Sequence, residues 1–374
     1  MVHGHKRIFA FATVAALVAT GTGTAHGGGL EANGYNWDLL FDPATFTGKG
    51  TITHVIINHD ITNTGYGTGT VATSSNRDYY NFAGKGDLLD NSSCLVSVQN
   101  PWGSGTDRDI TYAALTGQSA RERITSTDLG LTCSYGFSMG AGTLSIIGGI
   151  SGQQLNYEGD VPVTLTTTQP VSISGTGIGW RAGLAYEVPE IALRVSAIYN
   201  AAIDYNLSGT ANLAGFAAPA NADVTTPQTF EIKAQTGVAP GWLALGSVKW
   251  VDWSVVDQLS VDTLGGPLTT VLGYEDGWTV TAGVGHQLTE ELTVLGSLTW
   301  DKGTSRRNAA NVLENGTQTD RWGLSVGGAY KPSQNVEISG GVSYSLIGAG
   351  SNLQGETWDT GNVLAISGSI KASF

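Results

Sequence analysis

Apolar and polar residues alternate along most of the chain beyond residue 50. In the segment 180–188 every even position is apolar or aromatic, whereas Arg181 and Glu187 stand among the odd positions. The same period of two recurs at 230–235 and at 336–339. Because successive side chains of a strand point to opposite faces, each segment predicts a β-strand with one apolar and one polar face.

The alternation predicts fourteen strands joined by connections that are alternately short and long. The expected strands lie at 51–61, 94–101, 109–117, 126–137, 143–158, 178–188, 192–207, 228–238, 242–253, 278–288, 292–301, 321–331, 336–346 and 362–374. Connections such as 189–191 and 332–335 are short, whereas 159–177, 208–227, 254–277 and 302–320 are long. Outer-membrane barrels combine an even strand number with short turns at one end and long loops at the other. The pattern therefore predicts an all-β fold, a 14-stranded antiparallel transmembrane β-barrel.

The two ends of the chain fit export to an outer membrane. Residues 1–27 hold Lys6 and Arg7, an apolar run at 8–18 and then small residues, which predicts a signal peptide. The apolar run is too short to span a membrane, which takes about 20 apolar residues. We expect the barrel at 51–374, preceded by a short N-terminal segment at 28–50. The last strand ends in Phe374 and resembles the signal by which the barrel-assembly machinery recognises its substrates.

Composition narrows the classes of function. The formal net charge is −13 and only 13% of residues are charged. The acidic balance disfavours nucleic acid as a partner, because phosphates need Lys and Arg. The 53 glycines follow no Gly-X-Y period, which excludes collagen, and two cysteines exclude a disulfide-built scaffold. His54, His59 and His286 have no metal-ligand spacing, so we expect no enzyme activity, metal or cofactor.

Several short motifs resemble the FadL-type family of outer-membrane transport proteins. Residues 227–230 read Pro-Gln-Thr-Phe, 241–243 read Gly-Trp-Leu, and 249–254 contain the pattern W-x-x-W-S. Residues 41–44 resemble the family's Asn-Pro-Ala element, with Asp42 in place of Asn. The resemblance implies a 14-stranded barrel that carries long-chain fatty acids or aromatic hydrocarbons. It also implies a kinked strand that opens sideways into the bilayer, which we expect within 104–123.

The resemblance implies that the segment 28–50 is an N-terminal plug, although it is shorter than the plug usual in that family. It either inserts into the lumen or forms a packed periplasmic strap. In the first case the pathway would be lined by Trp37, Leu39, Leu40, Phe41 and Pro43.

Two long loops carry apolar side chains that a sugar or ion porin would not need. They are Leu213 and Phe216 in one loop and Leu264, Leu268, Val271 and Leu272 in the other. Folded together, the two loops would form an apolar groove that binds a hydrophobic ligand. The alternative is that each loop packs against itself or touches lipopolysaccharide.

Charged lumen residues offer contacts for a ligand carboxylate. Arg181 and Lys233 are the candidates, although Arg181 has Glu231 as an alternative partner. Arg194 and Glu187 face each other across a short turn, which predicts a structural ion pair.

The expected strand map places Cys94 and Cys133 two strands apart. A disulfide needs Cα atoms within about 7 Å, so the map predicts no bridge between them.

Together these features predict a passive outer-membrane channel for hydrophobic compounds, with long-chain fatty acids as the first expectation. The ligand would adsorb to the apolar outer loops and leave sideways into the membrane, driven by the burial of apolar surface. The expected partners are hydrophobic small molecules or fatty acids, outer-membrane lipid and lipopolysaccharide, and the barrel would be a monomer. A general diffusion porin and a non-conducting structural surface barrel are the alternatives.

Overall fold

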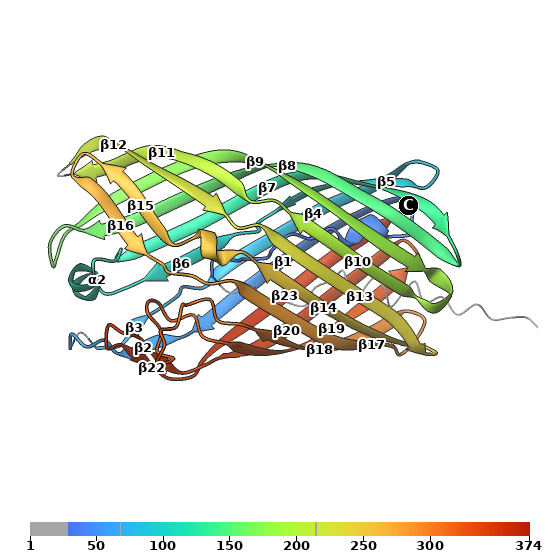
Figure 1. Ribbon diagram of the computed structural model, residues 1–374. Coiled ribbons are helices and arrows are strands. Elements are labelled where there is room, and N and C mark those ends of the chain that lie inside the picture. The colour runs from blue at the N-terminus through green and yellow to red at the C-terminus, as the bar shows by residue number, and fades with distance from the viewer. Residues whose placement is uncertain (1–28, 68, 214) are drawn as a thin grey trace, which may run out of the picture.

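The computed structural model describes residues 29–374 except Thr68 and Ala214, so the expected signal peptide lies outside the described residues. The chain forms a closed antiparallel barrel of fourteen strands (Figure 1). In ring order these are β1 (Phe46–Asn58), β4 (Arg77–Leu89), β5 (Ser92–Gln99), β7 (Arg121–Met139), β8 (Gly142–Pro162), β9 (Thr168–Val188), β10 (Leu193–Asn200), β13 (Thr229–Ala239), β14 (Trp242–Val251), β17 (Gly277–Gln287), β18 (Leu292–Asp301), β19 (Arg321–Ser333), β20 (Val336–Ile347) and β23 (Gly361–Ser373). Pairing between β1 and β23 closes the ring, which confirms the predicted fold class.

The two ends of the barrel differ as the connection lengths predict. At one end, here called the turn end, neighbouring strands are joined by tight turns, and the chain ends there at Phe374. Asn91, Gly140 and Gly241 have φ of 64°, 61° and 75° in three of these turns, a conformation that Gly and Asn adopt at little cost. The opposite end, here called the loop end, carries the remaining elements.

The elements outside the ring are further strands of 2 to 11 residues and short helical segments of 3 to 7 residues. They are β2 (Asp60–Asn63), β3 (Val71–Ala72), β6 (Gly103–Asp107), β11 (Ile203–Leu213), β12 (Phe216–Thr226), β15 (Gln258–Thr263), β16 (Gly266–Val271), β21 (Gly350–Ser351), β22 (Thr357–Trp358), α2 (Ile110–Thr116), η1 (Asp38–Phe41), η2 (Pro189–Ile191) and η3 (Trp253–Val255). No helix in the described part of the chain combines the length and the apolar character needed to cross a membrane.

The outward face of the barrel carries an apolar belt. On β9 the outward positions from Ile178 to Tyr186 are apolar or aromatic, and Trp180 is 53% exposed. A tilted strand crosses a membrane in about 9–11 residues, which matches this stretch. On β19, Trp322 and Tyr330 are likewise exposed, one at each end of the stretch that belongs to the belt. This is the position expected for interfacial aromatic residues.

One side of the barrel rises far beyond this belt. β8 and β9 have 21 residues each, against 8 to 13 for most of the ring. The hairpin β11–β12 pairs with β9, and the hairpin β15–β16 pairs with β12 (Figure 1). These parts are called the outer wall. The connections expected as loops at 208–227 and 254–277 are thus hairpins, and most of 159–177 belongs to β8 and β9.

The predicted strand map is wrong in one region, between β1 and β7. It lacks β4, whose outward face contains Gly84 and Gly86 and therefore shows little apolar alternation. It also places a strand at 109–117, where the structure has α2. Asp109 caps this helix by accepting hydrogen bonds from the N–H groups of Thr111 and Tyr112. The two errors cancel in the strand count.

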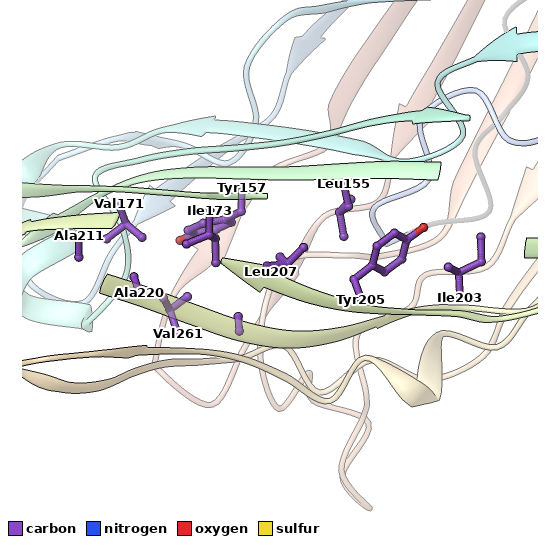
Figure 2. Packing of buried hydrophobic residues seen from close by; sticks show 11 residues of the cluster. Leu155, Tyr157, Val171, Ile173, Ile203, Tyr205, Leu207, Ala211, Ala220 and Val261 are labelled. Atoms are coloured by element: carbon purple, nitrogen blue, oxygen red, sulfur yellow. The ribbon is translucent and has the colours of Figure 1, made fainter. Parts of the chain in front are cut away.

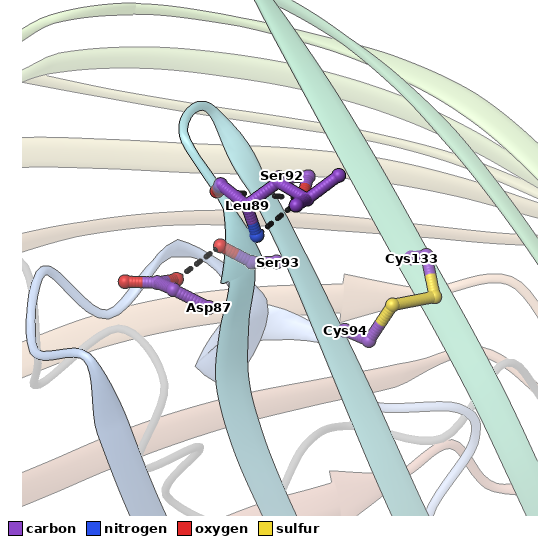
Figure 3. Close-up of a disulfide and its surroundings, with 6 residues drawn as sticks. All are labelled: Asp87, Leu89, Ser92, Ser93, Cys94 and Cys133. Atoms are coloured by element: carbon purple, nitrogen blue, oxygen red, sulfur yellow. Dashed lines mark hydrogen bonds between the residues drawn. A yellow bond between two sulfur atoms is a disulfide. The ribbon is translucent and has the colours of Figure 1, made fainter.

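The same error explains the wrong prediction for the cysteines. With no strand between them, β5 pairs directly with β7, and Cys94 lies opposite Cys133. Their Cα atoms are 4.0 Å apart and the two residues form a disulfide (Figure 3). The bridge lies near the turn end, close to the hairpin that joins β4 to β5. It fixes β5 against β7.

The N-terminal segment 29–45 runs inside the barrel and is called the plug segment. Trp37, Leu39 and Leu40 are buried there against inward-facing residues of the barrel strands. These partners are Leu95, Ile147, Ala185 and Ile198. The segment ends earlier than the expected boundary of residue 50, because β1 begins at Phe46. Of the two alternatives, the structure has the lumen plug and not the periplasmic strap.

Candidate functional site

The third strand of the ring is interrupted beside the plug segment. β5 ends at Gln99 and β6 begins at Gly103, and the residues 100–102 between them are called the ladder break. β4 pairs with β5 as far as Gln99, whereas β6 pairs with β7 alone. This interruption lies just upstream of 104–123, the segment in which a kinked strand was expected.

The plug segment supplies the hydrogen bonds that the ladder break lacks. The Ala32 N–H donates to the Pro101 carbonyl at 2.9 Å, and the Gly103 N–H donates to the Leu30 carbonyl at 2.8 Å. On the β4 side, the Tyr80 N–H donates to Asn100 Oδ1 at 3.0 Å. Side chains and the plug segment thus replace backbone pairing between two neighbouring wall strands at this level.

Ion pairs fix the plug segment to the lumen wall. Lys233 Nζ lies 3.0 Å from Asp38 Oδ2, and Lys249 Nζ lies 2.6 Å from Glu31 Oε1. Burial alone would raise the pKa of Asp38, but the positive charges of Lys233 and Arg194 outweigh it and hold the pKa below its usual value. Lys233, expected as a ligand contact, is therefore engaged by the plug segment.

Asp42 has a similar role at the turn end of the plug segment. Its Oδ2 lies 3.0 Å from Lys371 Nζ, on the last strand of the barrel. Lys85 donates to the backbone carbonyls of Asp42 and Ala44 at 3.0 and 2.7 Å. Asp42, the aspartate of the Asp-Pro-Ala sequence, thus has a cationic partner, Lys371, that an asparagine would not need. The neighbouring Pro43, which was expected to line the pathway, is exposed.

Arg181 and Arg194 also have protein partners. Arg181 Nη2 lies 3.5 Å from Asp128 Oδ1, both side chains are nearly fully buried, and the guanidinium lies over the Tyr35 ring at 5.2 Å. Arg181 thus pairs with Asp128 and not with Glu231. Arg194 lies 3.9 Å from Glu187, as predicted, and its guanidinium covers the Phe41 ring at 4.7 Å.

A cavity of about 440 Å³ lies at the loop end, above the plug segment, and is called the outer cavity. The outer wall carries a cluster of buried apolar residues that points inward (Figure 2), and three members of this cluster, Leu155, Tyr157 and Leu207, line the cavity. The cluster contains Leu155, Tyr157, Val171, Ile173, Ile203, Tyr205, Leu207, Ala211, Ala220, Ala222 and Val261. Volumes of 300–1,000 Å³ are typical of sites for small ligands.

Aromatic residues form the floor of the outer cavity. Trp102 of the ladder break stacks edge-on with Trp253 at 5.5 Å between ring centroids, and Trp253 stacks with Tyr274 at 5.9 Å. Leu30 of the plug segment packs against this group. None of these residues was among the expected site residues. Trp253 stands in the W-x-x-W-S motif, which was the available signal, whereas Trp102 is brought here by the ladder break alone.

The apolar loop residues that were expected to bind the ligand lie in different surroundings in the structure. Val271 and Leu272 line the outer cavity, and Leu268 lines a smaller neighbouring cavity of about 170 Å³. Phe216 and Leu264 are 79% and 78% exposed at the hairpin ends and line neither cavity. Leu213 is the last residue of β11. The two loops do fold together, through the pairing of β12 with β15.

A third cavity, of about 140 Å³, lies beside the plug segment, deeper in the lumen. In contrast to the outer cavity, its wall carries five charged groups, on Glu31, Asp38, Glu231, Lys233 and Lys249, together with many amide and hydroxyl groups. The described residues contain no group of His, Cys, Asp and Glu arranged to hold a metal ion.

Comparison with known proteins places the chain in a family. A family model described as "Outer membrane protein transport protein (OMPP1/FadL/TodX)" matches residues 90–370. The chain belongs to this family. It is an outer-membrane protein, and the turn end of this FadL/TodX-family barrel faces the periplasm, as in outer-membrane barrels in general.

Curated relatives of the FadL/TodX-family barrel match it over part of their length. Outer membrane protein P1 of Haemophilus influenzae is 25% identical over 176 residues, 45% of this chain and 38% of that protein. The long-chain fatty acid transport protein of Escherichia coli is 24% identical over 294 residues, 70% of this chain and 60% of that protein. The chain thus spans less than two thirds of the length of these relatives.

Solved structures share the fold over nearly the whole chain. A Pseudomonas aeruginosa FadL homologue superposes with a TM-score of 0.72 at 15% identity, covering 95% of this chain and 98% of that one. The Pseudomonas putida toluene transporter TodX gives a TM-score of 0.63 at 13% identity, covering 90% and 92%.

Proposed function

We propose that this barrel takes up hydrophobic compounds passively across the outer membrane, by capture in the outer cavity and lateral release at the ladder break. The observation that carries the proposal is the position of Trp102, which belongs to the ladder break and also lines the outer cavity. A ligand on the cavity floor is therefore next to the one level at which β4 and its neighbour lack backbone pairing.

The difference between the outer cavity and the charged cavity beside the plug segment supports release sideways into the membrane. Moving an apolar molecule out of an apolar environment costs about 25 cal/mol per Å² of surface exposed to water. The deeper cavity is lined by five charged groups, whereas the exit past Trp102 leads toward lipid. The sideways route keeps the ligand in apolar surroundings and avoids the charged lumen.

Names of relatives are consistent with a hydrophobic cargo. One relative is called a long-chain fatty acid transport protein and one structural neighbour a toluene transporter. Long-chain fatty acids, the expectation from sequence, and aromatic hydrocarbons are both hydrophobic compounds. A diffusion porin fits less well, because the plug segment occupies the lumen and is fixed there by ion pairs.

Filling the outer cavity tests the proposal. Ile124 lines the cavity, whereas its neighbour Thr125 is exposed on the opposite face of β7. We expect Ile124→Trp to lower toluene binding to the purified protein, and toluene entry into cells lacking other uptake routes, at least tenfold. Thr125→Trp is the matched control and should leave both near the wild-type value. Equal behaviour of the two variants would exclude the outer cavity as the capture site.

A further inference from the structure

The charges in the wall of the outer cavity bear on the kind of ligand it accepts. Among the described lining residues, Arg108 carries the single positive charge, and Glu122 and Glu356 carry two negative charges. The remaining polar lining groups are hydroxyls and amides. A hydrophobic ligand with a carboxylate would therefore enter a cavity that already holds an excess of negative charge.

Arg108 is not available to offset this excess. Its Nη1 donates to the Ser119 carbonyl at 3.0 Å and lies 3.7 Å from Glu122 Oε2. The side chains of Arg108 and Glu122 are 15% and 19% exposed. A ligand carboxylate that took Arg108 would leave Glu122 without its cation in a largely buried position, which is strongly unfavourable.

Glu356 is held by neutral groups. It is 3% exposed, the Tyr112 hydroxyl donates to its Oε1, and the Asn352 amide donates to its Oε2 at 2.6 Å. None of the ion pairs among the described residues includes Glu356. Burial and the nearby Glu356 carboxylate both raise the pKa of Tyr112, which keeps its hydroxyl protonated as a donor.

Two further arginines lie near the cavity but do not line it. Arg321 Nη2 donates to Gln318 Oε1 at 2.6 Å, and Arg321 lies opposite Asp301 in the pairing of β18 with β19. Arg77 Nη1 donates to the Gly103 carbonyl at 3.4 Å. Gln318, which accepts this hydrogen bond from Arg321, itself lines the cavity.

We propose that the outer cavity selects uncharged hydrophobic molecules over hydrophobic carboxylates, and that Glu122 and Glu356 are specificity-determining residues. This inference rests on the proposed function and narrows its ligand class. The apolar outer wall and the aromatic floor bind the body of the ligand, while the two carboxylates supply a repulsive element against a negative headgroup. Discrimination by such a repulsive element is a general route to specificity.

Matched pairs of ligands test the proposal on the full chain, purified in a non-ionic detergent at pH 8. The pairs are toluene with benzoate and decanol with decanoate, and binding is read from tryptophan fluorescence, since Trp102 and Trp253 line the cavity. We expect the neutral member of each pair to bind at least tenfold more tightly, a difference of about 1.4 kcal/mol.

Substitution of the carboxylates sharpens the test. Glu122→Gln removes a negative charge and frees Arg108, so the ratio of carboxylate to neutral affinity should rise at least tenfold. Glu158→Gln makes the same change in charge on the exposed outer face of β8 and should leave the ratio unchanged. Because partition into detergent is the same for each protein, it cancels when these ratios are compared.

Each outcome has a distinct meaning. Equal or tighter binding of the carboxylates by the wild-type protein overturns the proposal, as does an equal rise in the ratio for Glu122→Gln and Glu158→Gln. Should Glu122→Gln fail to assemble, Glu356→Gln provides the same measurement with a side chain of nearly the same shape. Failure of all four ligands to bind would refute the proposed function itself, and the inference with it.

Discussion

Strand β8 passes through two regions of the molecule whose side chains are arranged in opposite ways. In its first half the outward residues Leu144, Ile146 and Ile150 are apolar, and inward positions include Ser145 and Ser151. In its second half the outward residues are Gln154, Asn156 and Glu158, and the inward residues are Leu155 and Tyr157. The alternation keeps its period and register, but apolar and polar side chains exchange faces.

The neighbouring strand changes at the same level. On β9, Ile178 and Trp180 face outward within the belt, whereas Ser172 and Ser174 face outward beyond it and Ile173 faces inward. At this level the surroundings of the outer face change from lipid to water. On the membrane side of this level apolar side chains are therefore favoured on the outer face, and beyond the membrane they are favoured on the inner face. The inward apolar surface of the outer cavity is thus a consequence of the wall leaving the membrane.

The largest expected effect concerns the inside of the membrane region. Arg181 and Asp128 form an ion pair there with almost no exposure to solvent. We expect Arg181→Met to destabilise the folded barrel by about 3–5 kcal/mol, because it leaves a buried carboxylate without its cation. Chemical denaturation of protein refolded into lipid vesicles measures the change.

The double variant Arg181→Met with Asp128→Asn is the control for that experiment. It removes both charges and should recover most of the loss. A single variant with near wild-type stability would show that the polar interior of the membrane region does not depend on paired charges.

The next effect concerns the inside of the outer wall. Leu207 is 2% exposed within the apolar cluster, and truncation of such a residue costs about 2–5 kcal/mol. We expect Leu207→Ala to reduce hydrogen-exchange protection in β11 and β12, with little change in the strands at the turn end. Ser208→Ala, on the exposed face of the same strand, is the matched control. Equal loss of protection in both variants would mean that the outer wall is not held by its inward cluster.

Most of the barrel is predictable from the sequence, because lipid outside and a polar lumen inside impose alternation strand by strand. The failures concern residues for which that constraint is weak. Gly84 and Gly86 hide the alternation of β4, and the apolar residues of α2 were assigned to a strand although Asp109 is a helix cap. The absence of a disulfide between Cys94 and Cys133 was a wrong prediction for the same reason, since register depends on which strands are neighbours.

The candidate site is less predictable, because it depends on contacts between distant segments. Val271 and Leu272 were expected from apolar content alone, and they do line the outer cavity. The same criterion selected Phe216 and Leu264, which are exposed, because composition does not distinguish the end of a hairpin from its packed face. The partners of Lys233 and Lys249 come from the plug segment, 195 and 218 residues away in sequence, and no local pattern reveals such pairs.

A lysine placed on the outward face of β8 sharpens the comparison at the point where the two regions meet. Ile146 is 53% exposed and lies opposite Leu184, near the middle of the apolar belt, and Asn156 faces outward on the same strand beyond the belt. A lysine near the bilayer midplane costs about 2–4 kcal/mol, falling to about 0–1 near the interfaces. We therefore expect Ile146→Lys to destabilise the protein by up to that larger amount in lipid vesicles, and Asn156→Lys to have almost no effect, with unfolding in denaturant as the measurement. Similar costs at the two positions would mean that the exchange of faces along β8 does not mark the outer boundary of the membrane.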